Sequence, residues 1–437
     1  MQAYRASIIH ILDDPDKVGP EACYQYFDDG VLVVDQGKVT KVGPAEQVLA
    51  ALDRNTPIRE YPDALIMPGF IDTHIHYPQT EMIAAFGEQL LEWLNAYTFP
   101  VEERFADPVY AKEIADRFLD ELLRNGTTTA LVFGKVHKAS VDSFFEACEE
   151  RNLRMVAGKV MMDRNAPDYL LDSADSAYQD SKALIEKWHD RGRLRYAVTP
   201  RFAPTSTPEQ LGKAGQLLEE HPGVYLHTHM SENADEIVWV EELFPHCDHY
   251  LHAYDEAGLL GRRSVFAHCI HLNDEEWQRM AESNSNIAFC PTSNLFLGSG
   301  LFNLKRAVQH DIGVGLGTDV GAGTSFSMIQ TMAEAYKVLQ LRGEKLTPLK
   351  SFYLATLGGA RALDMEDLIG NFECGKEADF VVLDKAPTPL MKFRLQRCKD
   401  VFELLFVIAM LGDDRTIKAT YSAGAKVHDR ENDQEKA

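Results

Sequence analysis

The sequence has little that would indicate a secreted, membrane-bound or nucleic-acid-binding protein. Its 7 cysteines are odd in number and irregularly spaced, and no C-x-x-C pair occurs. We therefore expect a reducing compartment and no disulfide framework. Basic residues are also scarce, since 44 Lys and Arg stand against 67 Asp and Glu, for a formal net charge of −23. A chain this acidic repels nucleic acid and anionic membranes, so we expect neither as a partner.

Long hydrophobic runs are absent as well. The most apolar late segment, residues 401–411, is short and contains Glu403, so it is not expected to span a bilayer. Residues 1–12 contain no apolar stretch of the length found in signal peptides. The chain is 45% hydrophobic and 25% charged, as in ordinary globular proteins. We therefore expect a cytoplasmic protein.

What the sequence does contain is a regular alternation of apolar runs and helical stretches. Near-continuous apolar runs are typical of strands that are buried on both faces of a parallel sheet. Pairs such as Asp107-Pro108 and Thr207-Pro208 are typical of helix N-termini. Eight β/α units most simply close into a (β/α)8 TIM barrel, with a doubly wound open sheet as the alternative. The eight runs are 66–76, 128–133, 154–161, 195–199, 224–229, 264–268, 286–290 and 313–319.

Both ends of the chain carry further strand-like segments. Residues 31–34 and 379–384 are short apolar runs next to turn residues, which is typical of β-strands. The sequence thus predicts a composite small β-sandwich domain built from both termini, residues 1–66 plus 378–437. The (β/α)8 barrel is expected over residues 67–377.

Histidines and one aspartate stand where several predicted barrel strands end. Side chains two apart on a strand point to the same side, so His74 and His76 can reach one metal ion. His229, His268 and Asp319 end three later strands, at the face where barrel active sites lie. One inward histidine with an incidental neighbour would explain a single pair, but not five such side chains at one face. Nitrogen and carboxylate donors without thiolate suit zinc, iron or manganese.

Two further residues occupy functional positions near these strand ends. Glu232 follows His229 by three residues and can lean over the metal without binding it, as a general acid/base would. The alternative for Glu232 is a helix N-terminal glutamate that the helix dipole favours. Arg201 stands at the end of the fourth predicted strand, where it can bind a ligand or form a surface salt bridge.

Longer motifs add a family resemblance. PGFIDTHIH, HTHMSE, AHC and GTD resemble the amidohydrolase superfamily, metal-dependent hydrolases on a (β/α)8 barrel. HIHYPQ, GEQLLEWL, PRFAPTS, FCPTSNLFLGSG and GTDVGAG resemble its guanine deaminase branch over nearly the whole chain. The resemblance implies metal binding by His74, His76, His229 and Asp319, and catalysis by Glu232, Asp319 and His268. It also implies a substrate site at Gln79, Arg201, His229, His268 and Trp93, and a homodimer.

The resemblance implies hydrolytic deamination of guanine to xanthine and ammonia by a metal-activated water, in purine catabolism or salvage. Two-metal members carry a lysine at the end of strand four, where this chain has Thr199-Pro200-Arg201, so we expect one zinc ion per chain, with iron as the alternative. The H-x-E and P-C-x-x-C signatures of cytidine-type deaminases are absent. Alternative functions are a pterin, adenosine-type or triazine deaminase of the same superfamily, or a non-catalytic assembly protein on the same barrel.

Overall fold

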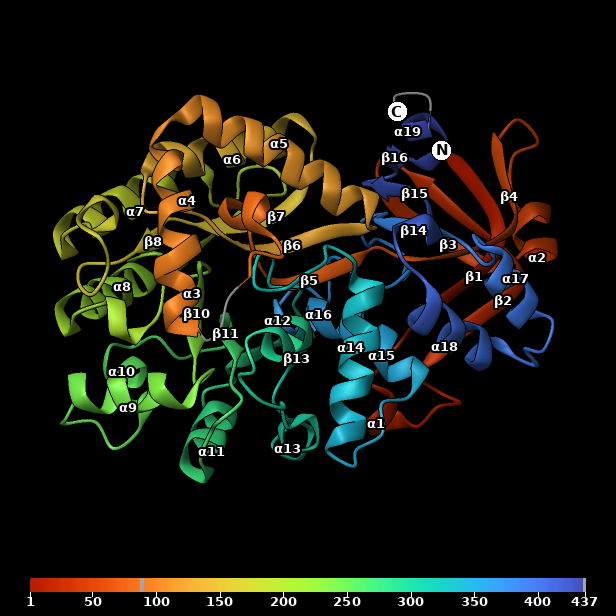
Figure 1. The fold of residues 1–437 in the computed structure, drawn as a ribbon. Helices are drawn as coiled ribbons and strands as arrows, with labels where there is room; N and C mark the ends of the chain where they lie inside the picture. Colours follow the sequence, from red (N-terminus) through yellow and green to blue (C-terminus); the bar gives the residue numbers. More distant parts are fainter. Residues whose placement is uncertain (87–89, 435–437) are drawn as a thin grey trace.

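The computed structural model describes residues 1–86 and 90–434 of the chain. Residues 87–89, which begin the motif GEQLLEWL, lie outside this range. Strands and helices alternate through the middle of the chain, and a second sheet lies to one side of them (Figure 1). The N-terminus and helix α19 (Arg430–Gln434), the last described helix, both lie on the side of the molecule where that second sheet is (Figure 1).

Parallel strands form a nearly closed barrel, which confirms the predicted (β/α)8 class over the open sheet. The sheet order is β5-β6-β7-β9-β10-β11-β12-β13, and the short β8 pairs with β9. Hydrogen bonds from Thr73 Oγ1 to the Leu316 carbonyl (3.0 Å) and from the Asp319 N–H to the His74 carbonyl (2.9 Å) join the last strand to the first. The strands are β5 (Phe70–His76), β6 (Thr127–Phe133), β7 (Arg154–Gly158), β8 (Val160–Met161), β9 (Arg195–Pro200), β10 (Tyr225–Met230), β11 (Ser264–His268), β12 (Asn286–Phe289) and β13 (Val314–Leu316).

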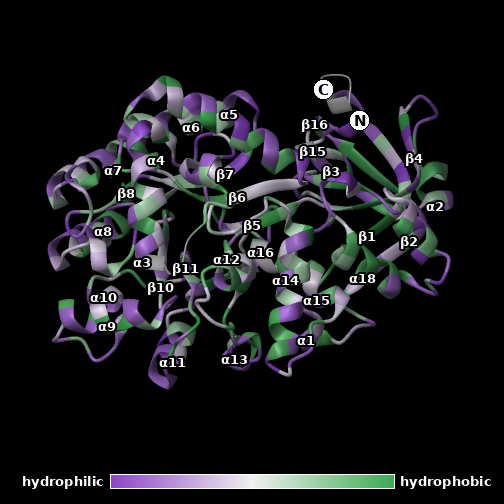
Figure 2. Ribbon diagram, viewed as in Figure 1, coloured by the Kyte–Doolittle hydropathy of each residue, from purple (hydrophilic) through white to green (hydrophobic). Residues whose placement is uncertain are grey.

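Helices surround these strands, and two of them begin at the predicted Asp107-Pro108 and Thr207-Pro208. The Asp107 side chain accepts a hydrogen bond from the Val109 N–H, and Thr207 caps its helix in the same way. Hydrophilic residues colour much of the outer helices, for example α11 (Figure 2). The helices that follow the strands are α5 (Pro108–Arg124), α6 (Lys138–Glu150), α7 (Ala174–Trp188), α8 (Pro208–Glu220), α9 (Ala234–Leu243), α10 (Tyr250–Glu256), α11 (Asp274–Glu282), α12 (Pro291–Phe296), α13 (Leu304–Gln309), α14 (Met328–Leu341), α15 (Pro348–Ala355) and α16 (Leu357–Ala362).

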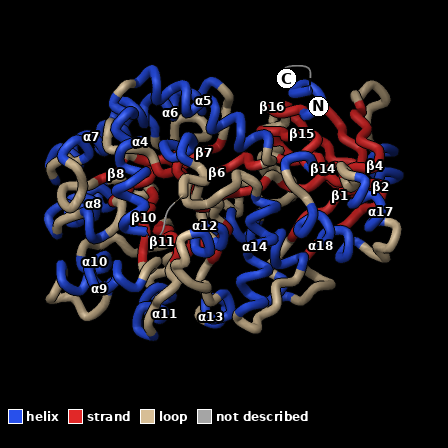
Figure 3. The backbone as a smooth tube through the Cα atoms, viewed as in Figure 1, coloured by secondary structure: helices blue, strands red, loops and turns tan. Residues whose placement is uncertain are grey.

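A chain of short helices separates the first barrel strand from α5. Figure 3 shows its helix α4 among the helices that surround the barrel strands. The segment contributes Gln79, Trp93 and Leu94 to the site described below. Its elements are η1 (Tyr77–Met82), α3 (Leu90–Trp93), η2 (Leu94–Thr98), α4 (Phe99–Glu103) and η3 (Arg104–Ala106). We refer to the described residues 77–86 and 90–106 as the cover segment.

Strands from both termini form one mixed seven-stranded sheet, in the order β16-β15-β14-β4-β1-β2-β3. β14 pairs antiparallel with β4, which brings the late strands onto the early ones, as the sequence predicts. The assignment of residues 1–66 plus 378–437 to one domain and 67–377 to another stays a prediction. The strands are β1 (Gln2–Ile11), β2 (Tyr24–Asp35), β3 (Lys38–Pro44), β4 (Ile58–Pro68), β14 (Phe380–Asp384), β15 (Ile417–Ser422) and β16 (Ala425–Asp429).

The remaining helices are short apart from one. They are α1 (Pro15–Val18), α2 (Ala45–Ala50), η4 (Asp168–Leu170), η5 (Ala203–Thr205), α17 (Pro389–Leu395), α18 (Val401–Leu411), η6 (Asp414–Thr416) and α19 (Arg430–Gln434). The apolar segment 401–411 is the helix α18, which packs with α14 and α15. Of the helices that the structure describes, none is both long and apolar enough to cross a membrane.

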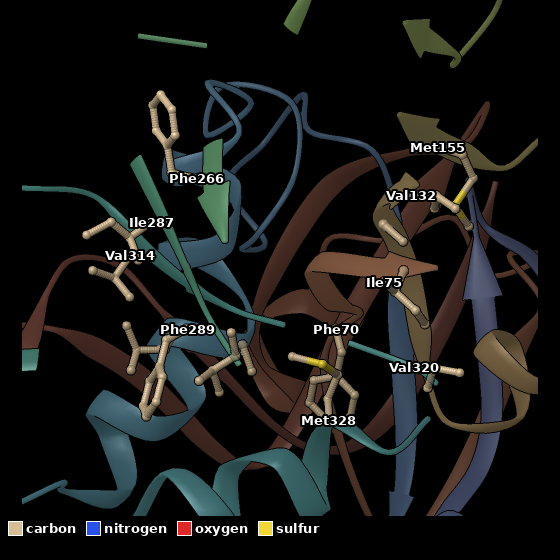
Figure 4. Packing of buried hydrophobic residues seen from close by; sticks show 14 of the residues in the cluster. Phe70, Ile75, Val132, Met155, Phe266, Ile287, Phe289, Val314, Val320 and Met328 are labelled. Carbon is tan, nitrogen blue, oxygen red and sulfur yellow. The ribbon is translucent and has the colours of Figure 1, made fainter. Parts of the chain in front are cut away.

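The core follows the alternation of side chains along the barrel strands. Val132 and Met155 belong to a large cluster between strands and helices, together with residues such as Phe70 and Ile287 (Figure 4). Their chain neighbours Leu131 and Val156 belong to a separate cluster of buried residues. Because side chains alternate along a strand, each barrel strand is buried on both faces. A rigid barrel of this kind can hold polar side chains in fixed positions at its strand ends.

Candidate metal centre and active site

The strand ends bring four predicted metal-binding residues together. His74 and His76 lie at the end of β5, His229 near the end of β10, and Asp319 three residues beyond β13. One donor atom from each of His74, His76, His229 and Asp319 lies within 4.8 Å of the others. His74, His76 and Asp319 are buried, so these polar groups need a partner inside the protein.

The donor atoms are spaced as ligands of one ion would be. His74 Nε2 lies 3.1 Å and His76 Nε2 3.3 Å from Asp319 Oδ1, and His229 Nε2 lies 3.2 Å from His76 Nε2. Tetrahedral ligands about 2.1 Å from a metal are separated by roughly 3.4 Å, which is close to these distances. The arrangement therefore has the size of a mononuclear site.

A hydrogen bond on the far side of the His229 ring directs the lone pair of its other nitrogen toward the space between the donor atoms. His229 Nδ1 donates to the Arg201 carbonyl at 2.7 Å, so Nε2 of the neutral ring is an acceptor. His74 Nδ1 lies 2.7 Å from His227 Nε2, a contact in which either ring can donate. Acceptor nitrogens that face one another and a carboxylate repel unless a cation lies between them. The donor set thus fits a bound metal ion.

The protonation states also suit metal binding. Burial lowers the pKa of His76 to about 4 and holds the pKa of His229 well below its ordinary value, so both rings are neutral at pH 7. Burial opposes ionisation of Asp319, but His74 and His76 beside it hold the pKa of this carboxyl well below its ordinary value. Neutral imidazoles and an ionised carboxylate are the forms that bind cations.

Asp72 fixes the position of two of these residues and was not identified from the sequence. Its carboxylate accepts hydrogen bonds from the His74 N–H (3.1 Å), the Thr318 N–H (3.1 Å) and Thr318 Oγ1 (2.5 Å). It therefore ties β5 to the segment that carries Asp319. Asp72 is part of the motif PGFIDTHIH. Nothing in the motif distinguishes an aspartate that positions the metal ligands from one that binds the metal itself.

Glu232 and His268 lie beside the four donors. Ser299 Oγ donates to Glu232 Oε1 at 3.0 Å, and His268 Nε2 lies 3.4 Å from Glu232 Oε2 and 3.7 Å from Asp319 Oδ2. His268 Nδ1 donates to Asn294 Oδ1 at 2.8 Å, which leaves Nε2 to face the site. Burial, assisted by the charge of Asp319, raises the pKa of Glu232 to about 8. A carboxyl group of this kind can hold and release a proton near neutral pH.

A cavity lies over these groups, lined by polar side chains and by apolar ones such as Trp93 and Phe202. Trp93 from the cover segment forms part of it and is itself buried, with its Nε1 donating to the Ala85 carbonyl at 3.3 Å. Trp93 is thus both a core residue and a lining residue. The described lining residues are His76, Gln79, Trp93, Leu94, Arg201, Phe202, His229, Glu232, Glu236, His268, Leu297, Asp319 and Ala322. Every site residue that the sequence predicted lies here except His74, which lies beneath His76 and His229.

Arg201 and Gln79 share a hydrogen-bond partner, Glu102, that no sequence motif predicts. Both side chains are buried, and Arg201 pairs with the buried Glu102 at 3.0 Å, so it does not form a surface salt bridge. Gln79 Nε2 donates to the same carboxylate at 3.2 Å. Lys135 forms a further ion pair with Glu102. Glu102 and Lys135 lie outside every motif quoted above, and only the folded chain brings them to this site.

The chain is similar to known proteins over nearly its whole length. The family model of the amidohydrolase family matches residues 65–427. The chain is 55% identical to guanine deaminase of Escherichia coli K12 over 433 residues, which covers 98% of both chains. The solved structure of E. coli guanine deaminase matches with a TM-score of 0.96, covering 98% of this chain and 100% of that one.

Two more distant structures help to place the chain. Guanine deaminase from C. acetobutylicum, solved with guanine in its active site, matches at 30% identity and a TM-score of 0.88, covering 98% of this chain and 100% of that one. An adenosine deaminase from Xanthomonas campestris matches at 23% identity and a TM-score of 0.85, covering 98% and 93%, which shows the fold alone. By sequence and by structure, the chain belongs to the amidohydrolase family, and within it to the group of the guanine deaminases.

Proposed function

We propose that the protein hydrolyses guanine to xanthine and ammonia. The observation that carries the proposal is the identity of 55% with a guanine deaminase over nearly the whole of both chains. The cavity supports it, because a donor set for one metal, a proton-carrying glutamate and an arginine–glutamine pair line one space. Pterin, adenosine-type and triazine deaminases remain as alternatives, but the adenosine deaminase and triazine hydrolase structures match at 23% identity or less.

We propose one zinc ion per chain, held by His74, His76, His229 and Asp319, with iron as the alternative. When bound, such a metal lowers the pKa of a coordinated water, so that hydroxide is available near pH 7. The end of strand four carries Arg201 where two-metal members carry a bridging lysine, which supports a single ion.

Glu232 is proposed to carry the protons. Guanine bears its exocyclic amine on C2, and water must add to this carbon. Glu232 takes the proton of that water and delivers it to ring N3, which makes C2 tetrahedral. A second proton passes to the amine, the C2–N bond breaks, and ammonia leaves as the C2 carbonyl of xanthine forms. Burial and Asp319 raise the pKa of Glu232 to about 8 in the metal-free chain. A bound cation nearby would lower this pKa, so that the carboxylate is available to take the proton.

We propose that Asp319 orients the attacking water and that His268 stabilises the charge that develops on its oxygen. Asp319 Oδ2 and His268 Nε2 lie 3.7 Å apart at the edge of the cavity, so both can hydrogen-bond the attacking water. As negative charge develops on the attacking oxygen, His268 can stabilise it. His229 lines the cavity, so it would hold the metal and also contact the substrate.

Arg201 and Gln79 are proposed to bind the carbonyl at C6 of guanine. A guanidinium group is a donor only, and the amide of Gln79 has a donor to offer as well. Trp93, Phe202 and Leu297 supply apolar walls for a flat ring. Adenine would place an amine against these donors and only a hydrogen at C2, so the pocket should reject it.

We further propose that the protein is a cytoplasmic homodimer that acts in purine catabolism or salvage. The acidic composition and the free cysteines support the compartment. For the dimer, α17 exposes Leu390 (63%) and Phe393 (69%) three residues apart, on one helix face. Light scattering of the purified protein tests the dimer directly.

A spectrophotometric substrate screen with metal-analysed protein tests the proposed activity. Guanine should be converted to equal amounts of xanthine and ammonia, while adenine and cytosine should show no detectable turnover. Guanosine should react weakly or not at all, because its ribose would meet the cover segment around Trp93. Faster consumption of a pterin or of adenine than of guanine would overturn the substrate assignment.

A further inference from the structure

Glu102 lies behind the two residues proposed to bind the C6 carbonyl. It is 1% exposed and is not among the described residues that line the cavity. Its carboxylate accepts from Arg201 Nη1 at 3.0 and 3.2 Å and from Gln79 Nε2 at 3.2 Å, and it pairs with Lys135. One buried carboxylate thus contacts both recognition side chains without reaching the substrate.

We infer that Glu102 is the positioning residue for carbonyl recognition: it holds Arg201 and Gln79 so that both direct donors at the C6 oxygen of a purine. The inference rests on the proposed function, because it assigns a role in the same pocket. It extends that function to a residue outside the cavity and to the chemical group that the residue selects.

The cover segment fixes Arg201 through one short helix. Phe99 and Glu102 are three residues apart on α4, so their side chains lie on the same helix face. The Arg201 guanidinium carbon lies 5.6 Å from the centre of the Phe99 ring, while Glu102 binds its edge. A free arginine side chain has many rotamers, and ordering it costs binding free energy. Here the ordering is complete before a ligand arrives, which favours tight and directional binding.

Glu102 also decides which way the Gln79 amide faces. A carboxylate only accepts hydrogen bonds, so the Gln79 atom 3.2 Å from Glu102 must be the nitrogen. The Gly321 N–H only donates, and it bonds Gln79 Oε1 at 3.1 Å. The amide therefore cannot flip without losing both bonds. Its second N–H remains to meet an acceptor, which is what a carbonyl provides and an amine does not.

The cluster of Glu102, Arg201 and Lys135 carries a net positive charge. Burial opposes ionisation of Glu102, but Arg201 and Lys135 lower its pKa to about 2, so it is ionised at pH 7. Burial lowers the pKa of Lys135 to about 8, which still leaves it largely protonated at pH 7. Two cations thus share one carboxylate, and the net charge of the three groups is positive. Such a cluster attracts the electron-rich oxygen of a lactam, whereas an isolated Arg–Glu pair would be neutral.

The test measures how Glu102→Gln binds two purines, one with and one without the C6 carbonyl. Hypoxanthine has the C6 carbonyl but no amine to release, and 2-aminopurine has the amine but no carbonyl. Glutamine has the size of glutamate and loses its charge, so Arg201 and Lys135 repel and Arg201 is released. We expect hypoxanthine binding, measured by calorimetry on zinc-loaded protein, to weaken by about 10- to 100-fold, and the KM for guanine to rise similarly. Binding of 2-aminopurine, followed by its fluorescence, should change by less than about threefold.

Glu377→Gln is the matched control. Glu377 is a partly buried carboxylate that also binds two cations, Arg154 at 2.7 Å and Arg193 at 2.6 Å. Arg154 begins β7, at the opposite end of the barrel from the cavity. This variant should bind both purines as the wild type does. Glu102→Asp keeps the charge, so it should retain the fold and bind hypoxanthine more tightly than Glu102→Gln does.

The outcomes separate this inference from the proposed function. Equal weakening of both purines in Glu102→Gln, or unchanged hypoxanthine binding, would overturn the positioning role. Failure of wild-type protein to turn over guanine would overturn the proposed function, yet hypoxanthine binding would still report on Glu102. If the wild type binds hypoxanthine no better than 2-aminopurine, carbonyl recognition itself is wrong and the inference fails with it.

Discussion

Replacing Glu232 by glutamine should lower catalysis and raise stability at the same time. The change exchanges one carboxylate oxygen for an amide nitrogen, so the hydrogen bond from Ser299 Oγ to Oε1 can be kept. Glutamine cannot accept the proton of the attacking water. Loss of a general acid/base typically slows a reaction by about 10²- to 10⁴-fold, or roughly 3–5 kcal/mol of barrier. We therefore expect kcat for guanine to fall at least about 100-fold while metal and purine binding persist.

The gain in stability follows from the pKa of Glu232, which burial and Asp319 raise from 4.5 to about 8. The protonated carboxyl is favoured in the folded chain, so its contribution to stability is fully present below pH 4.5 and is lost as pH rises through 8. At pH 7 the unfolded chain releases this proton and the folded chain keeps it. The interval from pH 4.5 to pH 7 corresponds to about 3 kcal/mol. Glutamine has no proton to release, so the metal-free variant should be more stable by about that amount at pH 7.

The assays are steady-state guanine turnover and urea unfolding of chelator-treated proteins. The variant and the wild type should differ in unfolding free energy at pH 7 and become similar near pH 4, where Glu232 is protonated in both states. A near-normal kcat would refute the catalytic role and reduce Glu232 to a residue at the start of helix α9. A variant less stable than wild type at pH 7 would refute the burial argument, even if kcat fell.

Three further predictions concern metal, substrate and acid stability. His76→Ala and Asp319→Ala should each lose most of the bound metal, measured by elemental analysis, whereas two tightly bound ions in wild type would contradict the single site. Arg201→Ala should raise the KM for guanine at unchanged metal content, and an unchanged KM would remove it from the binding site. Burial lowers the pKa of His10 from 6.5 to about 4, so the stability that its neutral ring contributes is present above pH 6.5 and is lost as pH falls to 4. Between pH 6.5 and pH 4, the unfolding free energy of the wild type, measured in urea, should fall by about 3 kcal/mol more than that of His10→Asn. Equal losses would contradict a buried, neutral His10.

The sequence predicts those parts of the molecule that local patterns determine. Runs such as 128–133 predict buried barrel strands because both faces of each strand are apolar, and His74 and His76 stand where such a strand ends. The strand segments of the small sheet at residues 31–34 and 379–384 are predicted as well, because their apolar runs and turns are local. The position of β1 between β4 and β2 is not, since pairing between distant segments leaves no mark on either one.

The missed site residues share one physical reason. Glu102 lies on a five-residue helix within the cover segment, and Lys135 follows β6 in a loop. Neither position has a periodic pattern, and a charged residue there is equally consistent with a solvated surface. Their burial comes from the closure of the barrel and from Arg201 on another strand end. The position of Arg201 at a strand end predicts a ligand-binding residue. Glu102, the carboxylate that holds it, is found only in the folded structure.

Xanthine formation measured against bound metal tests the central claim most directly. Chelator-treated protein should be inactive on guanine, and activity should rise in proportion to zinc bound by His74, His76, His229 and Asp319 until it saturates at about one ion per chain. Full guanine turnover by the metal-free protein, or a requirement for two ions per chain, would contradict the account.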